Sequence, residues 1–325
     1  MLKIARLKSS NVKILESMLL QYEYKPYRQY FTKSDDSKLN NYFLAKVGSL
    51  LSNEGTENLV AVKNSELVGL LSWSETSWDS QRLGIKMARI NQLIVQMAAS
   101  NTYLIKKLLS SIIERCKVKK IKYLFHRLDI DDLLTLQILE KLGFELQDVI
   151  VNFCFKLRAS KNSLLKSNFA IIRPYRSEDL SSLREIARTS FIYDRFHSDP
   201  RLNKKRSNQL HAAWISNACR GLADVVLVAK LKRKVVGFVS CKVDRLSKRY
   251  LPISFGYVDL IAVDRDVRGQ GIGEALMRKA LDWFSDKVDI IEVGTQVRNY
   301  PALHLYQKLG FEIVSANFSL RKWFS

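Results

Sequence analysis

Apolar and polar positions alternate along the chain in two rhythms. Stretches with a period of two, typical of half-buried strands, are separated by stretches in which apolar residues recur every three or four positions, as in amphipathic helices. In the first half this pattern predicts strands at Lys3–Leu7, Leu59–Val62, Leu67–Trp73, Lys86–Gln96, Tyr123–Arg127 and from Phe144 to Leu157, and helical stretches at Val12–Phe31, Lys38–Leu51, Leu104–Lys117 and Leu133–Leu142.

The second half repeats this order of elements. It predicts strands at Phe169–Arg173, Phe255–Val263 and Ile290–Thr295, a hairpin over Val225–Lys242, closing strands at the C-terminus, and helices at Leu180–Phe191, Ser207–Cys219, Gly271–Phe284 and Pro301–Leu309. The segment Lys141–Glu145 (KLGFE) recurs as Lys308–Glu312, at an offset of 308 − 141 = 167 residues. Leu67–Ser72 resembles Val235–Ser240 at the nearly equal offset of 235 − 67 = 168. Because this interval is the length of an ordinary domain, the chain is predicted to be a duplicated fold.

The boundary between the two copies is predicted at a polar segment. Arg158–Asn168 (RASKNSLLKSN) breaks the hydrophobic pattern, as a linker does. We therefore expect domains at residues 1–157 and 169–325, joined by a linker at 158–168. In each copy a glycine, Gly143 or Gly310, follows a helix and precedes a strand, so both are expected in the left-handed conformation that ends helices.

Composition excludes several classes of protein. The chain has 47% hydrophobic and 26% charged residues, which is ordinary for a soluble globular protein. It has no apolar run near the roughly 18 residues that span a bilayer, and no apolar leader follows Met1. Its cysteines, Cys116, Cys154, Cys219 and Cys241, lack metal-type or redox spacing. We expect a cytoplasmic protein without a metal.

The charge balance is strongly basic. The sequence has 53 Lys and Arg against 32 Asp and Glu, a net charge of +21 that attracts polyanions in general. The basic residues lie in short clusters, without the aromatic motif or docking helix of a nucleic-acid module. Nucleic acid is therefore not the expected partner. Solvated faces and the steering of a small anionic substrate both remain open.

A glycine-rich loop distinguishes the second copy from the first. Arg268–Gly273 (RGQGIG) follows an apolar strand and opens a predicted amphipathic helix. Glycines allow backbone N–H groups to approach an anion, and the helix N-terminus adds partial positive charge. The corresponding segment of the first copy, Gln96–Asn101, has no glycine. A phosphate-bearing ligand is therefore expected in the second copy.

This strand, the Arg-x-x-Gly-x-Gly loop and the following Asn299, Leu305–Tyr306 and Lys308–Phe311 resemble the GNAT superfamily of acetyl-CoA-dependent N-acyltransferases. The resemblance implies an α/β (α+β) fold of tandem GNAT domains, each a mixed, mostly antiparallel sheet flanked by helices, with a degenerate first domain. It also implies one acetyl-CoA site, in the second domain.

A narrower resemblance precedes the loop. Ser190–Phe191, Asp194–Pro200 (DRFHSDP) and Trp214–Asn217 are similar to segments of TDP-fucosamine acetyltransferases, which acetylate the 4-amino group of a dTDP-linked dideoxy sugar. In that family too, a degenerate GNAT domain precedes the catalytic one. The resemblance implies an anionic nucleotide sugar as acceptor and a place in lipopolysaccharide or O-antigen biosynthesis.

The GNAT arrangement implies roles for individual residues. Tyr306 would protonate the coenzyme A sulfur, and Asp259 or Asp148 would accept the ammonium proton through water. A structural salt bridge remains the alternative for each carboxylate, core packing for Tyr306, and a helix cap for Asn299. The expected cofactor contacts are Leu260, Ile261, Ala262, Val263, Arg268, Gly269, Gln270, Gly271, Ile272, Gly273 and Asn299, and the expected acceptor contacts are Arg195, His197 and Trp214. Backbone N–H groups near Ile261 would hold the oxyanion.

Two other functions stay open. One is acetylation of a protein or ribosomal N-terminus or of a lysine. The other is a non-catalytic regulator that binds acyl-CoA and uses its basic surface on nucleic acid. For the acetyltransferase of a nucleotide sugar we expect a small-molecule acceptor and no membrane span, and a homodimer is one possible assembly.

Overall fold

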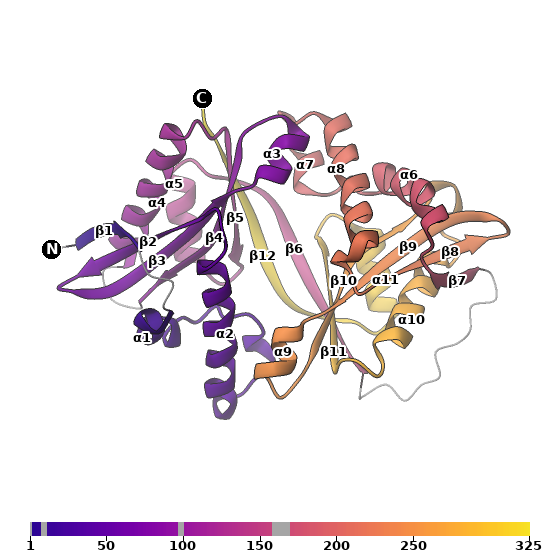
Figure 1. Cartoon of the computed structure of the whole chain (residues 1–325), viewed down its shortest axis with the longest axis horizontal. Coiled ribbons are helices and arrows are strands. Elements are labelled where there is room, and N and C mark those ends of the chain that lie inside the picture. The colour runs from indigo at the N-terminus through magenta and orange to yellow at the C-terminus, as the bar shows by residue number, and fades with distance from the viewer. Residues whose placement is uncertain (1, 8–11, 97–100, 158–169) are drawn as a thin grey trace. The chain divides into compact units, whose positions relative to one another are not determined.

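The computed structural model describes residues 2–7, 12–96, 101–157 and 170–325. By its internal contacts the chain forms two compact units, described here one at a time (Figure 1). Unit 1 comprises Met1–Asp148 and Ala316–Ser325, and unit 2 comprises Val149–Ser315. The predicted linker at 158–168 lies outside the described residues.

Unit 1 is a sheet with helices on both faces. Its strands are β1 (Leu2–Arg6), β2 (Thr56–Lys63), β3 (Glu66–Glu75), β4 (Met87–Val95) and β5 (Tyr123–Asp129), with parts of β6 (Glu145–Lys156) and β12 (Glu312–Trp323), and its helices are α1 (Glu16–Leu20), α2 (Asp36–Leu51), α3 (Ser77–Leu83), α4 (Asn101–Val118) and α5 (Leu133–Lys141). The order β1-β2-β3-β4-β5-β12 is antiparallel except for the parallel pair β4–β5. Helices α4 and α5 pack on one face of the sheet, and α1 and α2 pack on the other.

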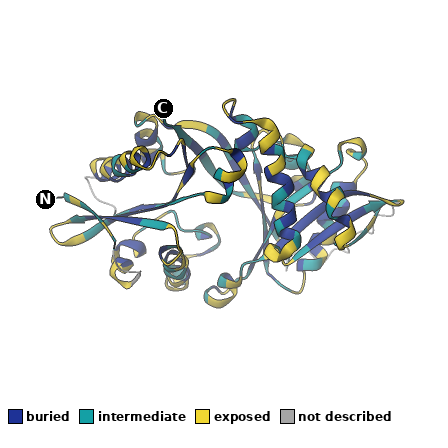
Figure 2. Ribbon diagram, turned by 45° about the horizontal axis from the view of Figure 1, so that its top comes forward, coloured by how far each residue is buried: buried dark blue, intermediate teal, exposed yellow. Residues whose placement is uncertain are grey.

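Unit 2 repeats this plan. Its strands are β7 (Ile171–Pro174), β8 (Val225–Leu231), β9 (Lys234–Val243), β10 (Phe255–Val263) and β11 (Ile290–Gln296), together with β6 from Val149 on, and its helices are α6 (Leu180–Ser190), α7 (Arg195–Ser198), α8 (Lys204–Asn217), α9 (Arg245–Tyr250), α10 (Ile272–Phe284) and α11 (Tyr300–Lys308). The order is β6-β11-β10-β9-β8-β7, with β10–β11 as its parallel pair. Helices α10 and α11 cover one face, and α6 and α8 cover the other. In Figure 2 the strands are largely buried, while many helices show buried and exposed sides. The expected fold class is confirmed.

The units do not follow the expected domain boundaries. Residues 150–156 of β6 pair with β11 of unit 2, although the sequence places them in the first domain. Residues 317–323 of β12 pair with β5 of unit 1, although the sequence places them in the second. Hydrophobic pattern reveals that a strand exists, but not which neighbour completes it, so this exchange could not be read from the sequence.

Two details of the expected elements also differ. The helix predicted over Val12–Phe31 is only a short 3-10 turn at Val12–Leu15 followed by α1, which ends at Leu20. Pro26 restricts continuation of a helix in this segment. The short helices α3, α7 and α9 were not predicted, because fewer than eight residues give little periodicity. Gly143 (φ +79°) and Gly310 (φ +85°) are left-handed, as expected.

Candidate active site

Strand β10 contains a break in its pairing at Asp259. Its parallel ladder with β11 ends at Val258 and Val293. On the other side, the ladder with β9 is interrupted between Val258 and Leu260, which makes Asp259 the extra residue of a β-bulge. β10 then continues to Val263, while β11 continues beside β6. Among the described residues, the edge of β10 that faced β11 thus has no ladder partner beyond the bulge.

The carboxyl group of Asp259 has an unusual environment. Its residue is exposed at the surface, but the surrounding protein partly desolvates the carboxyl, and this desolvation raises its pKa. The positive charge of Lys242 lowers the pKa by a smaller amount. A carboxylate with a raised pKa is a stronger base than an ordinary aspartate. The position and the raised pKa both suit a proton acceptor.

The four residues after the bulge face alternate sides. Leu260 and Ala262 pack with the core of α6 and α8, and Ile261 and Val263 pack with the core of α10 and α11. The backbone N–H of Leu260 donates to the Ser240 hydroxyl at 3.0 Å. These side chains therefore hold the strand in place, and the main chain is the part of this segment that can face a ligand.

The glycine loop follows β10 directly. Gly269 and Gly271 both have φ +78°, a left-handed conformation that side chains disfavour, and a Cβ at either position would meet nothing within 4 Å. Gly271 is the N-cap of α10, so the first N–H groups of this helix have no intrahelical partner. The open space and these donors fit a phosphate group.

Arg268 ties the glycine loop to its surroundings. Its Nε donates to the Val263 carbonyl oxygen at 3.0 Å, and its guanidinium also donates to the Ser190 hydroxyl at 3.3 Å. Ser190 is the last residue of α6, at the start of the segment that resembles a nucleotide-sugar enzyme. The loop and that segment are thus in direct contact.

Tyr306 lies on α11 inside the core of unit 2. Its side chain is 2% exposed, and its ring is 5.5 Å from Phe153 and 5.9 Å from Phe311. Burial raises the pKa of the phenol. The hydroxyl therefore stays protonated at neutral pH, which is the state required of an acid. No hydrogen-bond partner for it is found among the described residues.

The turn before α11 holds Asn299. This residue is the N-cap of α11, but its side chain does not cap the helix; its Nδ2 donates to the Thr295 hydroxyl at 2.9 Å. The side chain of Asn299 therefore does not act as a helix cap. Its neighbour Arg298 donates to the Ser198 hydroxyl, so this turn contacts the end of α7.

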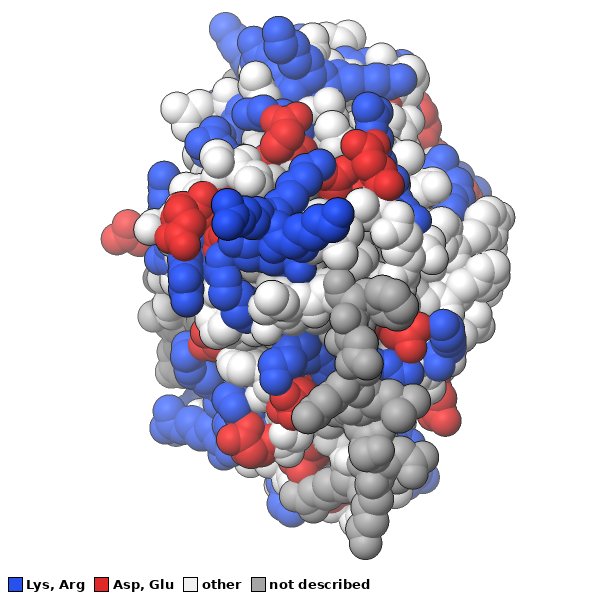
Figure 3. Space-filling model, turned by 90° about the vertical axis from the view of Figure 1, so that its right-hand side faces the viewer, with Lys and Arg blue, Asp and Glu red and all other residues white. Residues whose placement is uncertain are grey.

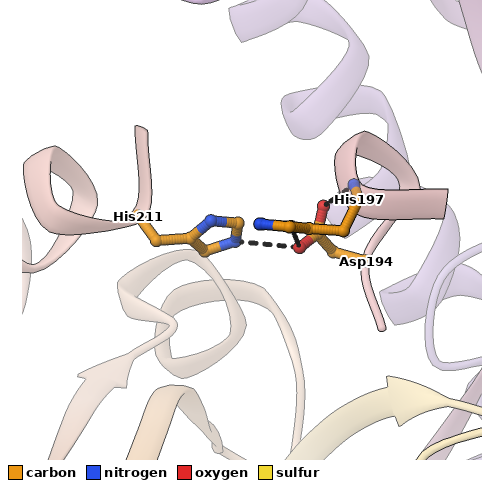
Figure 4. A group of neighbouring side chains, drawn as sticks. All are labelled: Asp194, His197 and His211. Atoms are coloured by element: carbon orange, nitrogen blue, oxygen red, sulfur yellow. Dashed lines mark hydrogen bonds and ion pairs between the residues drawn. The ribbon is translucent and has the colours of Figure 1, made fainter. Parts of the chain in front are cut away.

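The residues expected to meet the acceptor gather on α7 and α8. The guanidinium of Arg195 lies 4.2 Å from the Phe196 ring centroid, and Trp214 packs edge-on against His211 at 4.9 Å. His197 is nearly buried, with Nδ1 at 2.6 Å from Asp194 (Figure 4). Its Nε2 lies 2.7 Å from Asn208. Both ring nitrogens of His197 are thus bonded inside the protein. Asp194 and His211, which complete this cluster, were not singled out from the sequence.

Asp148 belongs to unit 1, whereas the other candidate residues belong to unit 2. It is the last residue of the first segment of unit 1 and is 6% exposed. The next residue, Val149, accepts a hydrogen bond from the Val297 backbone at 2.8 Å within unit 2. A catalytic role for Asp148 stays a prediction.

Unit 1 has the same framework without the same chemistry. Its parallel ladder ends at Ile90 and His126, and the bulge residue is Asn91, which corresponds to Asp259 at 259 − 91 = 168. Helix α5 aligns with α11 at 300 − 133 = 167, which places Leu139 where unit 2 has Tyr306. The segment opposite the glycine loop lies mostly outside the described residues. At two aligned positions, an ionisable side chain of unit 2 is thus replaced by one that cannot exchange a proton.

Part of the chain matches a known protein family. Residues 180–311 match the model of the acetyltransferase (GNAT) family. The chain is 25% identical over 263 residues to the spore coat polysaccharide biosynthesis protein SpsD of Bacillus subtilis, covering 80% of this chain and 86% of that one. It is 34% identical over 85 residues to N-alpha-acetyltransferase 30 of Homo sapiens, covering 26% of this chain and 23% of that one.

Solved structures show the same fold over the whole chain. A tandem GNAT protein from the clavulanic acid biosynthesis pathway aligns with a TM-score of 0.61 at 13% identity, covering 99% of this chain and 98% of that one. Within the described residues, no helix has both the length and the apolar character required to cross a membrane. The bulged strand, the glycine loop and the family match all lie in unit 2, so residues 180–311 form a GNAT-type acetyltransferase domain.

Proposed function

We propose that the protein transfers an acetyl group from acetyl-CoA to the amino group of a nucleotide-linked amino-dideoxy sugar, with a dTDP sugar as the expected form. The contact between Arg268 and Ser190 carries this proposal, because it joins the phosphate-binding loop to the segment that resembles nucleotide-sugar acetyltransferases. A donor site and an acceptor segment that touch can bring the two substrates together.

The donor site is formed by β10 and the glycine loop. The left-handed glycines and the N-terminus of α10 would hold the pyrophosphate, and Arg268 fixes the loop through Val263. The unpaired edge of β10 beyond the bulge would hold the amide arm by main-chain hydrogen bonds, and an N–H near Ile261 would stabilise the oxyanion. Asn299 lies in the turn between the end of β11 at Gln296 and the start of α11.

Two side chains would move protons. Asp259 would accept the ammonium proton through water, so that the neutral amine can attack the thioester carbonyl. Tyr306 would give its proton to the sulfur as the carbon–sulfur bond breaks. The second proton, which the nitrogen loses as the amide forms, would return to Tyr306 through water. The raised pKa of Asp259 makes its carboxylate more basic, which favours its role. Tyr306 is protonated at neutral pH and so has a proton to give, although its raised pKa makes it a weaker acid.

The acceptor is proposed to bind at α7 and α8. Lys204, Lys205 and Arg206 are exposed in the first turn of α8, where they could pair with a diphosphate. Arg195 and Trp214 supply a cation and an aromatic face. His197 would act indirectly by fixing α7, because its ring nitrogens are already bonded. Lys and Arg side chains also gather in a broad group on the face drawn in Figure 3, which suits an anionic acceptor.

The similarity to SpsD supports a sugar acceptor, because its name places it in polysaccharide biosynthesis and the match extends over most of both chains. The similarity to N-alpha-acetyltransferase 30 favours a second candidate, acetylation of a peptide N-terminus. That match covers only about a quarter of either chain. We therefore place the sugar first.

A panel assay tests the acceptor. Coenzyme A release would be measured with a dTDP-linked 4-amino-4,6-dideoxy sugar, a UDP-linked amino sugar, the same sugar without nucleotide, and a peptide with a free N-terminus. We expect turnover of the nucleotide sugars and little of the free sugar, because binding of the remote nucleotide helps to orient the amine. If the peptide or the free sugar reacts as well, the nucleotide-sugar proposal fails while the acetyltransferase assignment stands.

A pair of charge reversals sharpens this assay. Arg195→Glu should reduce turnover of the nucleotide sugar by at least about tenfold, the effect of losing one charge-assisted contact. It should leave acetyl-CoA affinity nearly unchanged. Arg184→Glu is the matched control, because Arg184 is an exposed arginine of α6 in the same unit and makes the same change in net charge. Equal effects of the two variants would mean that general charge, not a contact at Arg195, attracts the acceptor.

A further inference from the structure

Two histidine side chains of unit 2 converge on one carboxylate oxygen of Asp194. Asp194 caps α7, and its Oδ1 accepts hydrogen bonds from the backbone N–H groups of Phe196 at 2.7 Å and His197 at 3.3 Å. Its other oxygen, Oδ2, lies 2.6 Å from His197 Nδ1 and 3.3 Å from His211 Nε2 (Figure 4). The first oxygen is thus used by the backbone, and the second is shared by two imidazole rings.

The contact between His211 and Asp194 is unfavourable when the imidazole of His211 is neutral. His211 Nδ1 lies 3.0 Å from the Ser207 carbonyl oxygen, which can only accept, so this nitrogen carries a hydrogen. In the neutral ring Nε2 then has only a lone pair, and it faces the electron-rich Asp194 Oδ2. A proton or a metal ion between the two atoms removes the repulsion. His211 is 1% exposed, so water screens this repulsion little.

We propose that Asp194, His197 and His211 bind a late first-row divalent cation such as Zn²⁺, through Asp194 Oδ2, His197 Nδ1 and His211 Nε2. This inference is independent of the proposed acceptor. The three ligand atoms already lie within 4.8 Å of one another. Two imidazoles and one carboxylate form a donor set that suits zinc, and three protein ligands leave one coordination position for water.

The distances fit this cation after one small movement. Ligand atoms on a tetrahedral zinc with bonds of about 2.0–2.1 Å are separated by about 3.3 Å. The separation of His211 Nε2 from Asp194 Oδ2 already has this value. His197 Nδ1 is closer to the oxygen, at the distance of a hydrogen bond. It would withdraw by about 0.7 Å when its proton is replaced by the metal.

The outer contacts also suit metal ligands. Ligating histidines usually donate their second N–H to a carbonyl, carboxylate or water, which fixes the ring. His211 does so to Ser207, and its ring stacks on Phe191 at 4.9 Å. His197 Nε2 lies 2.7 Å from Asn208, whose amide oxygen can accept its hydrogen.

Asn208 distinguishes the two states of the cluster. With its amide turned over, the Asn208 nitrogen donates to His197 Nε2 and reaches the carbonyl oxygens of Lys204 and Arg188 at 3.2 and 3.3 Å. That orientation suits a metal-free cluster, in which His197 keeps its hydrogen on Nδ1. The opposite orientation suits the metal-bound cluster. The charges of Lys204 on His197 and of Arg195 on His211 oppose a cation here, but the opposing effect of the Asp194 carboxylate on each ring is larger.

Zinc binding to the full chain tests the proposal. The protein would be stripped with a chelator, dialysed and titrated with ZnCl₂ by calorimetry, and Co²⁺ absorption would report the coordination. We expect one tight equivalent per chain. Asp194→Asn and His211→Gln should each weaken it by more than about 100-fold, and Asn208→Ala should weaken it by about 10- to 100-fold, as loss of an outer contact does.

The control is His304→Gln, because His304 is an exposed histidine outside the cluster and its loss should leave zinc binding unchanged. Asp194→Asn keeps an oxygen that can cap α7, and circular dichroism would confirm that each variant is folded. If the folded wild type binds zinc no more tightly than folded Asp194→Asn or His211→Gln, the cation is only a proton and the metal site does not exist. Loss of binding in His304→Gln alone would equally overturn the assignment.

Discussion

The rings of Tyr306 and Phe153 pack edge to face, with centroids 5.5 Å apart and an interplanar angle of 62°. Tyr306 belongs to the second half of the chain, whereas Phe153 lies on β6, a strand that the sequence places in the first domain. The candidate acid is thus held in position by a residue from the other half of the duplication. Exchange of the closing strands makes each unit dependent on residues from both halves of the sequence.

Removal of the Tyr306 hydroxyl should affect catalysis without affecting the fold. Tyr306→Phe keeps the ring that packs on Phe153 and removes the proton donor. We expect kcat to fall by about 10²- to 10⁴-fold while acetyl-CoA affinity stays nearly constant. Steady-state kinetics and calorimetry measure the two quantities. The matched control is Tyr123→Phe, which removes a hydroxyl that bonds Gln147 in unit 1 and should leave kcat intact. An unchanged kcat in Tyr306→Phe would assign this tyrosine to the core alone.

Phe153→Ala should destabilise unit 2. Phe153 is fully buried, and loss of such a side chain costs about 3–5 kcal/mol of unfolding free energy through the cavity that it leaves. Denaturant unfolding measures this cost. A stronger form of the same test expresses residues 1–157 and 169–325 as separate chains. Each would lack a strand, β12 in the first chain and β6 in the second, so neither should give a cooperative thermal transition alone. Two independently folded fragments would show that the strand exchange is not needed for stability.

The glycine loop should bind one acetyl-CoA per chain. Gly271→Asp places a carboxylate where the pyrophosphate is expected and should abolish binding, since like charges repel. Gly271→Asn has nearly the same shape and a similar tolerance of the left-handed conformation, so it separates charge from backbone strain and should retain more affinity. Gly55→Asp controls for the backbone, because Gly55 in unit 1 also has φ +84° and open space around it. Calorimetry that gives two sites per chain would contradict the loss of the site in unit 1.

The sequence predicted the plan of the molecule better than its assembly. Periodicity identified most strands and long helices, because each buries one face against a core. The repeat around Gly143 and Gly310 revealed the duplication, because both helices must end in the left-handed conformation there. The strand exchange was invisible, since β6 and β12 look like ordinary closing strands and their neighbours are set by long-range contacts.

The site shows the same division. The Arg268–Gly273 loop has a local signature, because its glycines are required by backbone geometry, and it was found from the sequence. Asp194, the N-cap of α7, and His211 on α8 lie 211 − 194 = 17 residues apart, so no motif of fixed spacing links them. Only the packing of α7 against α8 brings them together. The exclusion of metal-binding cysteines by their spacing was no guide to a site made from histidines and one carboxylate.

The bulge residue should set the acid limb of the pH profile. Because desolvation raises the pKa of Asp259, kcat/KM should fall on acidification at a pH above the ordinary aspartate value of about 3.9, as the base becomes protonated. Asp259→Asn, which copies Asn91 of unit 1, should lose most activity together with this limb.

The effect of the same substitution on stability should be the opposite of its effect on activity. A carboxyl with a raised pKa in the folded state contributes stability that is fully present below its unfolded pKa and is lost as the pH rises through its folded pKa. The neutral asparagine avoids that loss, so the variant should melt at or above the wild-type temperature at pH 7.

Asp266→Asn serves as the control, because Asp266 is exposed in the turn before the glycine loop. This substitution should change neither the acid limb of the pH profile nor kcat. A wild-type acid limb that survives in Asp259→Asn would assign the base to another group, with Asp148 as the next residue to replace.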